Sequence, residues 1–237
     1  MTESPALKAP PRFLLTSPDV SPRFQALLNP TRALAFRITH VRNIRWLLEH
    51  GLWSRSSETT DPTFVTIGNE DLIGKRQTRP VPVPPGGVLA DYIPFYFTPF
   101  SPMLFNIHTG RSVTQRPNEE IVILVSSLEE LRHYGVDVVI TDRHAYLEAA
   151  RYSNDLNDVR DFVPWPALQA RMFKKDPLDL EPFERYQAEA LAHRHVPVQA
   201  LCGVVCYSEA VRSAVEEQSL LAGSEVDVIT RPGWYFS

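Results

Sequence analysis

The sequence predicts a single domain of the α+β class, and three observations support this prediction. Segments typical of strands and of helices follow one another without the strict β–α–β alternation of a doubly wound sheet. The 237 residues are 43% hydrophobic, which is enough for one sizeable core. The strand-linked G-x-G-x-x-G turn of a Rossmann dinucleotide site is missing from the sequence, which has only 10 glycines.

The N-terminal stretch differs from the rest of the chain. Residues 1–27 are punctuated by Pro and Ser without periodicity, so we expect a flexible leader there and one domain over residues 28–237. The leader lacks an apolar signal core, and no apolar run in the sequence reaches membrane-spanning length, so we expect a cytoplasmic protein without a membrane contact. The formal net charge of −4 argues against nucleic-acid binding through bulk electrostatics.

The first predicted elements form a strand, a turn and a helix. Ala33–Thr39 alternates as a strand does, and the following "HVRNIRWLLEHG" has apolar residues at helical spacing, with Gly51 as the C′ residue. The next segment, Ser54–Gly87, is polar and rich in Pro and Gly. Such a long segment predicts irregular structure with a functional role, or disorder.

An aromatic run, "DYIPFYFTPFSPML", comes next. Pro94 and Pro99 argue against a regular central strand there, because proline cannot donate to a ladder. Most of these aromatic residues are expected in the core. The alternative is that the turn at Ser101–Pro102 helps to hold a nucleobase by stacking.

The second half has clearer patterns. Four segments read as strands: "EEIVILV", "VDVVIT", "GVVCYS" and "EVDVIT". Four read as helices: "SSLEELRHYG" with Ser127 and Glu130 spaced as a capping box, "RHAYLEAARY" capped by Asp142, "WPALQARMF" with Pro166 in its first turn, and "EAVRSAVEEQSLL" capped by Ser208. The two cysteines, Cys202 and Cys206, lack a second pair of ligands, so we expect buried thiols and no metal site.

The stretch "RYQAEALAHRHVP" contains one carboxylate, Glu189, whose role depends on local structure. In a helix, Arg185 and His193 would share its face, and Glu189 would form a solvated salt bridge. In a strand, it could point into a cleft. The apolar spacing fits both structures.

Thr39-His40 and Arg76 are further candidates. Thr39-His40 lies at a strand end, and the alternative is that His40 makes a structural bond at the turn. Arg76 lies in "GKRQTR", and the alternative is that it is surface charge.

Seven blocks in order carry a resemblance that is more specific than any one motif: "RITHVRNIRWLLEHGL", "IGNEDLIGKR", "DYIPFYFTPFSPML", "RPNEEIVILV", "TDRHAY", "VPWPALQAR" and "ERYQAEAL". Together they resemble the DarT family, toxins that ADP-ribosylate single-stranded DNA using NAD. The resemblance covers the chain from about Leu28 to its end. It implies the ADP-ribosyltransferase fold, a split β-sheet core with surrounding helices.

The resemblance also implies site residues. The arginine of the "GKR" block, Arg76, and the glutamate of "QAE", Glu189, match catalytic residues of the family. The NAD site that the resemblance implies consists of Ile38, Thr39, His40, Asn43, Ser54 and Arg76. NAD is thus expected as co-substrate, without a metal.

The implied function is transfer of ADP-ribose from NAD to N3 of thymine in single-stranded DNA, within a short sequence motif. This would block replication, as part of a toxin–antitoxin system with a DarG-like macrodomain antitoxin. Many family members have bulky residues after the glutamate, as in "AEFLV", whereas this chain has "AEALAH". Transfer to guanine in DNA or to RNA therefore stays open. A catalytically silent nucleic-acid-binding module is a further alternative, and the presence of both Arg76 and Glu189 argues against it.

Overall fold

The computed structural model describes residues 26–237. The predicted leader falls almost wholly on residues 1–25, outside the described residues. Leu28, where the predicted domain begins, is 1% exposed and belongs to the main apolar cluster.

Most strands belong to one eight-stranded sheet with the order β10-β9-β4-β1-β3-β7-β5-β6. Neighbouring strands are antiparallel except for β9 and β10, which confirms the α+β class. A separate two-stranded ladder joins β2 to β8. The strands are β1 (Leu34–His40), β2 (Leu52–Trp53), β3 (Tyr92–Tyr96), β4 (Ile121–Ser127), β5 (Val138–Thr141), β6 (Tyr152–Ser153), β7 (Glu189–His193), β8 (His195–Val196), β9 (Gly203–Cys206) and β10 (Val228–Thr230).

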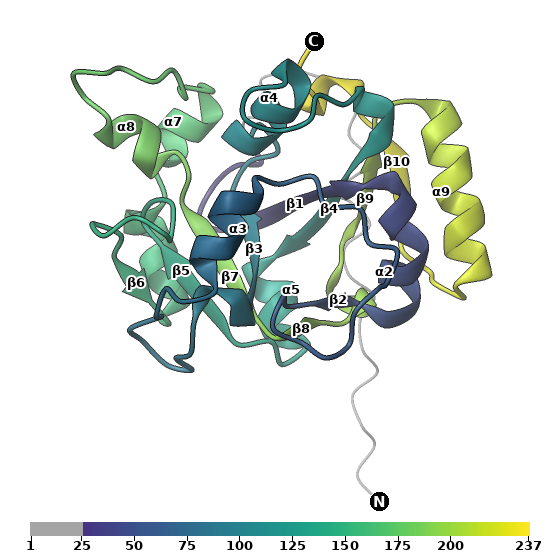
Figure 1. Cartoon of the computed structure of the whole chain (residues 1–237), viewed down its shortest axis with the longest axis horizontal. Helices are drawn as coiled ribbons and strands as arrows, with labels where there is room; N and C mark the ends of the chain where they lie inside the picture. Colours follow the sequence, from purple (N-terminus) through teal and green to yellow (C-terminus); the bar gives the residue numbers. More distant parts are fainter. Residues whose placement is uncertain (1–25) are drawn as a thin grey trace, which may run out of the picture.

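Helices surround this sheet (Figure 1). In this view α2 and α9 lie together at the right, in contact with each other, and α7 and α8 lie at the upper left. The α-helices are α2 (Ile44–His50), α3 (Glu70–Arg76), α4 (Pro102–Thr109), α5 (Leu128–His133), α6 (Val159–Phe162), α7 (Trp165–Gln169), α8 (Glu181–Arg185) and α9 (Glu209–Leu221). Short 3₁₀ helices include η2 (Val41–Asn43), η3 (Leu89–Asp91) and η4 (Asn118–Glu120).

Several predicted helix ends are confirmed. The hydroxyls of Ser127 and Ser208 accept the backbone N–H groups of Glu130 and Val211, as N-caps do. Gly51 follows α2 at φ +77° and ψ −172°, a conformation that is essentially restricted to glycine. A Cβ there would also lie 2.6 Å from the carbonyl oxygen of Val196, so this position requires glycine for two reasons.

The centre of the sheet is split between β1 and β3. These strands pair at one register only, Phe36 with Tyr96, whereas β1 pairs with β4 along its whole length. Continuing the register would place Ile38 opposite Pro94, which has no N–H to donate. The guanidinium of Arg37 instead donates to the carbonyl of Pro94 at 2.9 Å. The strands therefore separate at the proline, and the split core expected from the resemblance is present.

The prediction that prolines exclude a regular central strand here was wrong. Pro94 lies in the middle of β3, opposite Leu191 of β7, between two neighbouring strands. It is tolerated because the side of β3 that faces β1 is not continuously paired, so a missing N–H leaves no gap in a ladder.

Two further predictions need correction. The segment Ser54–Gly87 is not wholly irregular, because it contains α3, whose N-cap Asn69 accepts the N–H of Leu72 at 2.9 Å. Asp142 does not cap a helix. Its carboxylate accepts the backbone N–H and the Nε–H of Arg151, both at 2.9 Å, and residues 142–151 form turns that return the chain to β6.

Candidate active site

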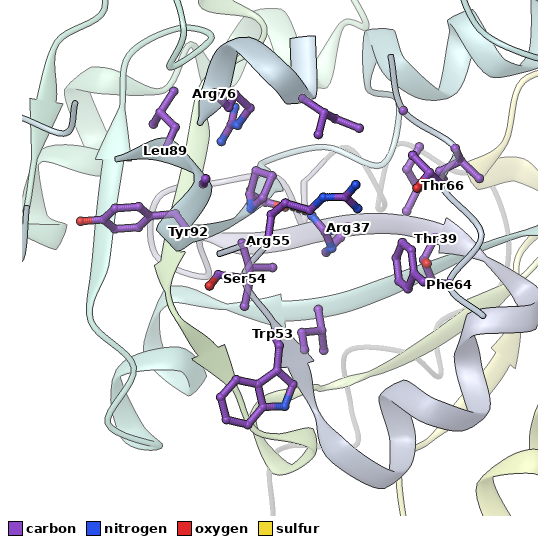
Figure 2. A pocket seen from close by; sticks show the side chains of 18 of the residues that line it. Arg37, Thr39, Trp53, Ser54, Arg55, Phe64, Thr66, Arg76, Leu89 and Tyr92 are labelled. Atoms are coloured by element: carbon purple, nitrogen blue, oxygen red, sulfur yellow. Dashed lines mark hydrogen bonds between the residues drawn. The ribbon is translucent and has the colours of Figure 1, made fainter. Parts of the chain in front are cut away.

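A cavity of about 330 Å³ opens where β1 and β3 separate (Figure 2). Its floor comes from these two strands, and its walls come from the segment after β2 and from α3. In Figure 2, Arg76 lies at one end and Trp53 at the other, with Arg37 and Arg55 between them. Phe64 and Thr39 also line the cavity and are drawn to the right of the two arginines in this view. The cavity therefore has a cationic middle and one aromatic end.

Glu189 is the first residue of β7, and its side chain is fully buried. Its carboxylate accepts the backbone N–H of Ala145 at 3.1 Å and pairs with Arg76, whose Nη1 lies 3.1 Å from Oε2. Burial raises the pKa of Glu189, but Arg76, His144 and the Ala145 N–H outweigh it, so the pKa lies below its usual value. The carboxylate is therefore ionised at neutral pH.

This geometry decides between the two structures considered for the "QAE" stretch. Glu189 lies at a loop–strand junction, not on a helix face. Arg185 ends α8 and donates to the backbone carbonyls of Asp161 and Phe162, so it does not form the local salt bridge of the helical alternative. The partner of Glu189 is instead Arg76, which is 113 residues away in sequence.

Arg76 is the last residue of α3 and lines the cavity, so it connects Glu189 to that space. Its side chain is 12% exposed. Nη1 contacts Glu189, while Nη2 is buried and has no hydrogen-bond partner among the described residues. Nη2 can therefore donate to a second acceptor. A buried, partly unpaired guanidinium of this kind does not fit the alternative that Arg76 is only surface charge.

Three residues near this pair were not selected from the sequence: Arg37, Tyr96 and His144 all line the cavity. Burial lowers the pKa of Arg37 to about 10, and the nearby charge of Arg76 adds to this effect. Burial likewise raises the pKa of Tyr96 and lowers that of His144. Nδ1 of His144 accepts the N–H of Tyr146 at 3.2 Å, so the neutral ring has its proton on Nε2.

The structure brings some of the expected NAD residues to the cavity: Ile38, Thr39, Ser54 and Arg76 lie in its wall. His40 does not line it. Its Nδ1 accepts the N–H of Arg42 at 3.1 Å, and its Nε2 lies 3.3 Å from Glu120. His40 thus holds the turn that follows Thr39, and a direct contact with the cofactor stays a prediction.

Asn43 also lies outside the cavity wall, and it holds that wall in place. Its side-chain amide donates to the carbonyl of Val65 and accepts the N–H of the same residue, at 3.0 and 2.8 Å. It also donates to the hydroxyl of Thr39 at 3.0 Å. Asn43 is 1% exposed, so it fastens the segment after β2 to β1 from the inside.

No helix among residues 26–237 is both long and apolar enough to cross a bilayer. In the same residues no group of three His, Cys, Asp or Glu side chains is arranged to hold a metal ion. Burial raises the pKa of both cysteine thiols to about 12, so they stay protonated at neutral pH.

Comparison with known proteins identifies this arrangement. Residues 36–236 match the family model described as "ssDNA thymidine ADP-ribosyltransferase, DarT". The chain belongs to the DarT family. The match spans the cavity and both members of the Arg76–Glu189 pair.

Curated DarT-like relatives agree in length as well as in sequence. A DNA ADP-ribosyl transferase of Escherichia coli O127:H6 is 51% identical over 215 residues, which are 90% of this chain and 98% of that protein. One from Thermus sp. 2.9 is 34% identical over 203 residues, covering 85% and 95% of the two chains.

Solved DarT structures share the fold. Thermus sp. 2.9 DarT in complex with ADP-ribosylated single-stranded DNA superposes with a TM-score of 0.80 at 31% identity, covering 88% of this chain and 98% of that one. The same protein in complex with NAD⁺ gives a TM-score of 0.75. The family, the ADP-ribosyltransferase class acting on DNA and the NAD co-substrate expected from the sequence are thereby confirmed.

Proposed function

We propose that this DNA ADP-ribosyltransferase transfers ADP-ribose from NAD to N3 of a thymine in single-stranded DNA, within a short sequence motif. The observation that carries the proposal is the Arg76–Glu189 pair at one end of the cavity. A buried carboxylate held ionised by a guanidinium is suited to a reaction in which positive charge develops on a ribose.

The cavity supports NAD as the substrate that lies there. NAD has an anionic pyrophosphate between two nucleoside ends, and Arg37 and Arg55 lie between the two ends of the cavity (Figure 2). We place the nicotinamide ribose at the Arg76 end and the adenosine at the end that contains Trp53. Ile38, Thr39 and Ser54 supply further wall, Asn43 holds that wall, and His40, beside Thr39, is proposed to contact the nicotinamide-side ribose.

The reaction exchanges one glycosidic bond for another. The bond from the anomeric carbon to nicotinamide breaks, and a bond from that carbon to thymine N3 forms. Glu189 stabilises the positive charge on the ribose in the transition state, where stabilisation accelerates the reaction. Arg76 stabilises the negative charge that develops on the base as N3 loses its proton.

The proton of N3 passes to Glu189 in this scheme. Arg76 contributes to the low pKa of that carboxylate in the ligand-free protein. When the guanidinium turns toward the anionic base, its hold on Glu189 weakens and burial raises the pKa. The same movement that stabilises the base therefore makes Glu189 a better proton acceptor. Arginine itself stays protonated and does not act as the base.

The acceptor is proposed to be single-stranded because pairing in a duplex hides N3. Unpairing costs a few kcal/mol, and a protein with a net charge of −4 has little bulk attraction for phosphates to offset it. Aromatic side chains near the cavity, such as Tyr96, could stack on a short splayed strand.

The test is mass spectrometry of oligonucleotides that contain one thymine each, offered single-stranded and annealed, with NAD. We expect labelling of the single strand and little labelling of the duplex. Equal labelling of both would contradict the accessible-N3 argument. Labelling of thymine-free strands at guanine, or of RNA, would change the acceptor and leave the enzyme class intact.

In the cell, we propose that this modification blocks replication and that a DarG-like macrodomain antitoxin removes it. The support is the family resemblance. Induction of the wild-type chain in bacteria should arrest growth, whereas induction of Glu189→Gln should not, and co-expression of a macrodomain hydrolase should restore growth. Arrest by both forms would point to toxicity without transfer.

A further inference from the structure

Thr141 is the last residue of β5, and the hydrogen-bonding of the sheet changes there. The ladder between β5 and β7 runs from Val138 opposite Ala192 to Ile140 opposite Ala190. One further step would pair Thr141 with Glu189, but the ladder to β7 ends at Ile140, whereas on the other edge of β5 Thr141 still pairs with Tyr152 of β6. The backbone of Glu189 therefore begins its strand without a ladder partner on this side.

The hydroxyl of Thr141 replaces that partner. Its Oγ1 accepts the backbone N–H of Glu189 at 3.1 Å and donates to the carbonyl of Arg143 at 2.7 Å. Thr141 is 0% exposed, so water does not compete for either bond. Leaving the buried N–H of Glu189 without an acceptor would be costly. The hydroxyl of Thr141 therefore stabilises the start of β7 at Glu189.

The second bond of the hydroxyl reaches Glu189 by another route. By fixing the carbonyl of Arg143, Thr141 sets the first turn of the loop that presents the N–H of Ala145 to the carboxylate, at 3.1 Å. The hydroxyl of Tyr152 donates to the carbonyl of the same Ala145. The hydroxyl of Thr141 thus holds both the backbone of Glu189 and the loop that contacts the Glu189 side chain.

From this arrangement we propose that Thr141 is a positioning residue for transfer, acting through Glu189 and resting on the proposed role of that carboxylate. Thr141 does not itself belong to the cavity wall in the described part of the chain. Its hydroxyl should therefore govern the rate of transfer and leave NAD affinity nearly unchanged. A displacement of the reacting groups by about 1 Å can cost on the order of 100-fold in rate.

The matched variants are Thr141→Val, which keeps the shape but removes the hydroxyl, and Thr141→Ser, which keeps the hydroxyl but removes the methyl group. We expect the valine variant to transfer roughly 100-fold more slowly under single-turnover conditions, the serine variant within a few-fold of wild type, and NAD titrations without DNA to agree for all three. Equal rates for the folded valine and serine variants would overturn the proposal. So would a loss of NAD affinity that parallels the loss of rate.

Two additions keep the test decisive. If Thr141→Val does not fold, Thr141→Cys, whose thiol is a poor hydrogen-bonding group, should fall below Thr141→Ser in rate. Hydrogen exchange of the Glu189 amide, followed by mass spectrometry, needs no activity and separates this proposal from the choice of acceptor. We expect faster exchange in the valine or cysteine variant than in the serine variant. Identical protection would overturn the positioning role even if wild-type transfer is confirmed.

Discussion

The guanidinium of Arg76 covers the carboxylate of Glu189. Nη1 lies 3.1 Å from Oε2 and 3.4 Å from Oε1, and the two side chains are 12% and 0% exposed. Arg76 lines the cavity, whereas Glu189 is fully buried and contacts that space through Arg76 and His144, which both line it. The four predictions below depend on this pair and on the walls around it.

Glu189→Gln should nearly abolish transfer while the protein keeps its fold and its NAD site. Glutamine has the same shape but lacks the charge that stabilises the ribose, so we expect a loss of roughly 3–4 kcal/mol in the transition state. Single-turnover labelling measures this loss, and Glu181→Gln on α8, a side chain that is 65% exposed, is the control. A rate near that of wild type would remove Glu189 from the mechanism.

Arg76→Gln should change how stability depends on pH. In the wild type, the pKa of Glu189 is lowered, so the ionised carboxylate stabilises the fold. This stabilisation is complete above the pKa of Glu189 in the unfolded chain, and it is lost as the pH falls through the pKa of Glu189 in the folded protein. In the variant, burial outweighs the remaining partners and raises that pKa, so an ionised Glu189 destabilises the fold at neutral pH. The difference in Tm between wild type and variant should therefore be smaller at pH 5 than at pH 7.

Arg45→Gln serves as the control for this comparison, because the Arg45–Glu49 pair is more exposed. Its effect on Tm should be small at both pH values. A Tm difference for Arg76→Gln that does not change with pH would show that Arg76 does not set the ionisation of Glu189.

Asn43→Ala should lower both stability and NAD affinity. The substitution removes both hydrogen bonds to the half-buried backbone of Val65, and a typical hydrogen bond contributes about 0.5–1.5 kcal/mol to stability. In a domain of this size each kcal/mol lowers Tm by roughly 2–4 °C. Thermal unfolding and NAD titration measure the two effects, with the exposed Asn154→Ala as control. Unchanged NAD affinity in a destabilised variant would show that the Val65 segment is not part of the site.

Arg37→Gln should weaken NAD binding more than it slows transfer from bound NAD. A charge-assisted hydrogen bond contributes about 1.5–3 kcal/mol, which corresponds to a rise in Kd of roughly 10- to 150-fold. Arg37→Lys, which keeps the charge, should bind NAD better than Arg37→Gln. Equal Kd values for the two variants would show that the charge at this position does not contact the cofactor.

Local signals predicted the elements that depend on local chemistry. The caps at Ser127 and Ser208, the glycine after α2 and the buried strand over Ile121–Ser127 all follow from short-range patterns. The helix α3 had such signals too, since Asn69 precedes two acidic residues and Arg76 ends the helix, but the Pro- and Gly-rich surroundings hid them.

The candidate site was harder to predict because its contacts join distant segments. Periodicity could not decide whether Glu189 belonged to a helix or a strand, because the apolar spacing around it fits both. Its partner Arg76 lies on another element, so no local pattern shows the pair. The resemblance identified both residues. It did not identify Arg37, Tyr96 or His144, which come from β1, from β3 and from the loop after β5 and meet at the cavity only in the folded chain.

The single-register junction at Phe36 and Tyr96 has a mechanical consequence. Two half-sheets, β10-β9-β4-β1 and β3-β7-β5-β6, are each continuous ladders, and between β1 and β3 they share one ladder register and the hydrogen bond from the Arg37 side chain to Pro94. We expect the junction to be flexible, because one half-sheet can rotate slightly against the other without breaking a continuous ladder. The cleft would then widen or narrow by rigid-body motion of the half that contains Glu189, while the carboxylate keeps its own hydrogen bonds.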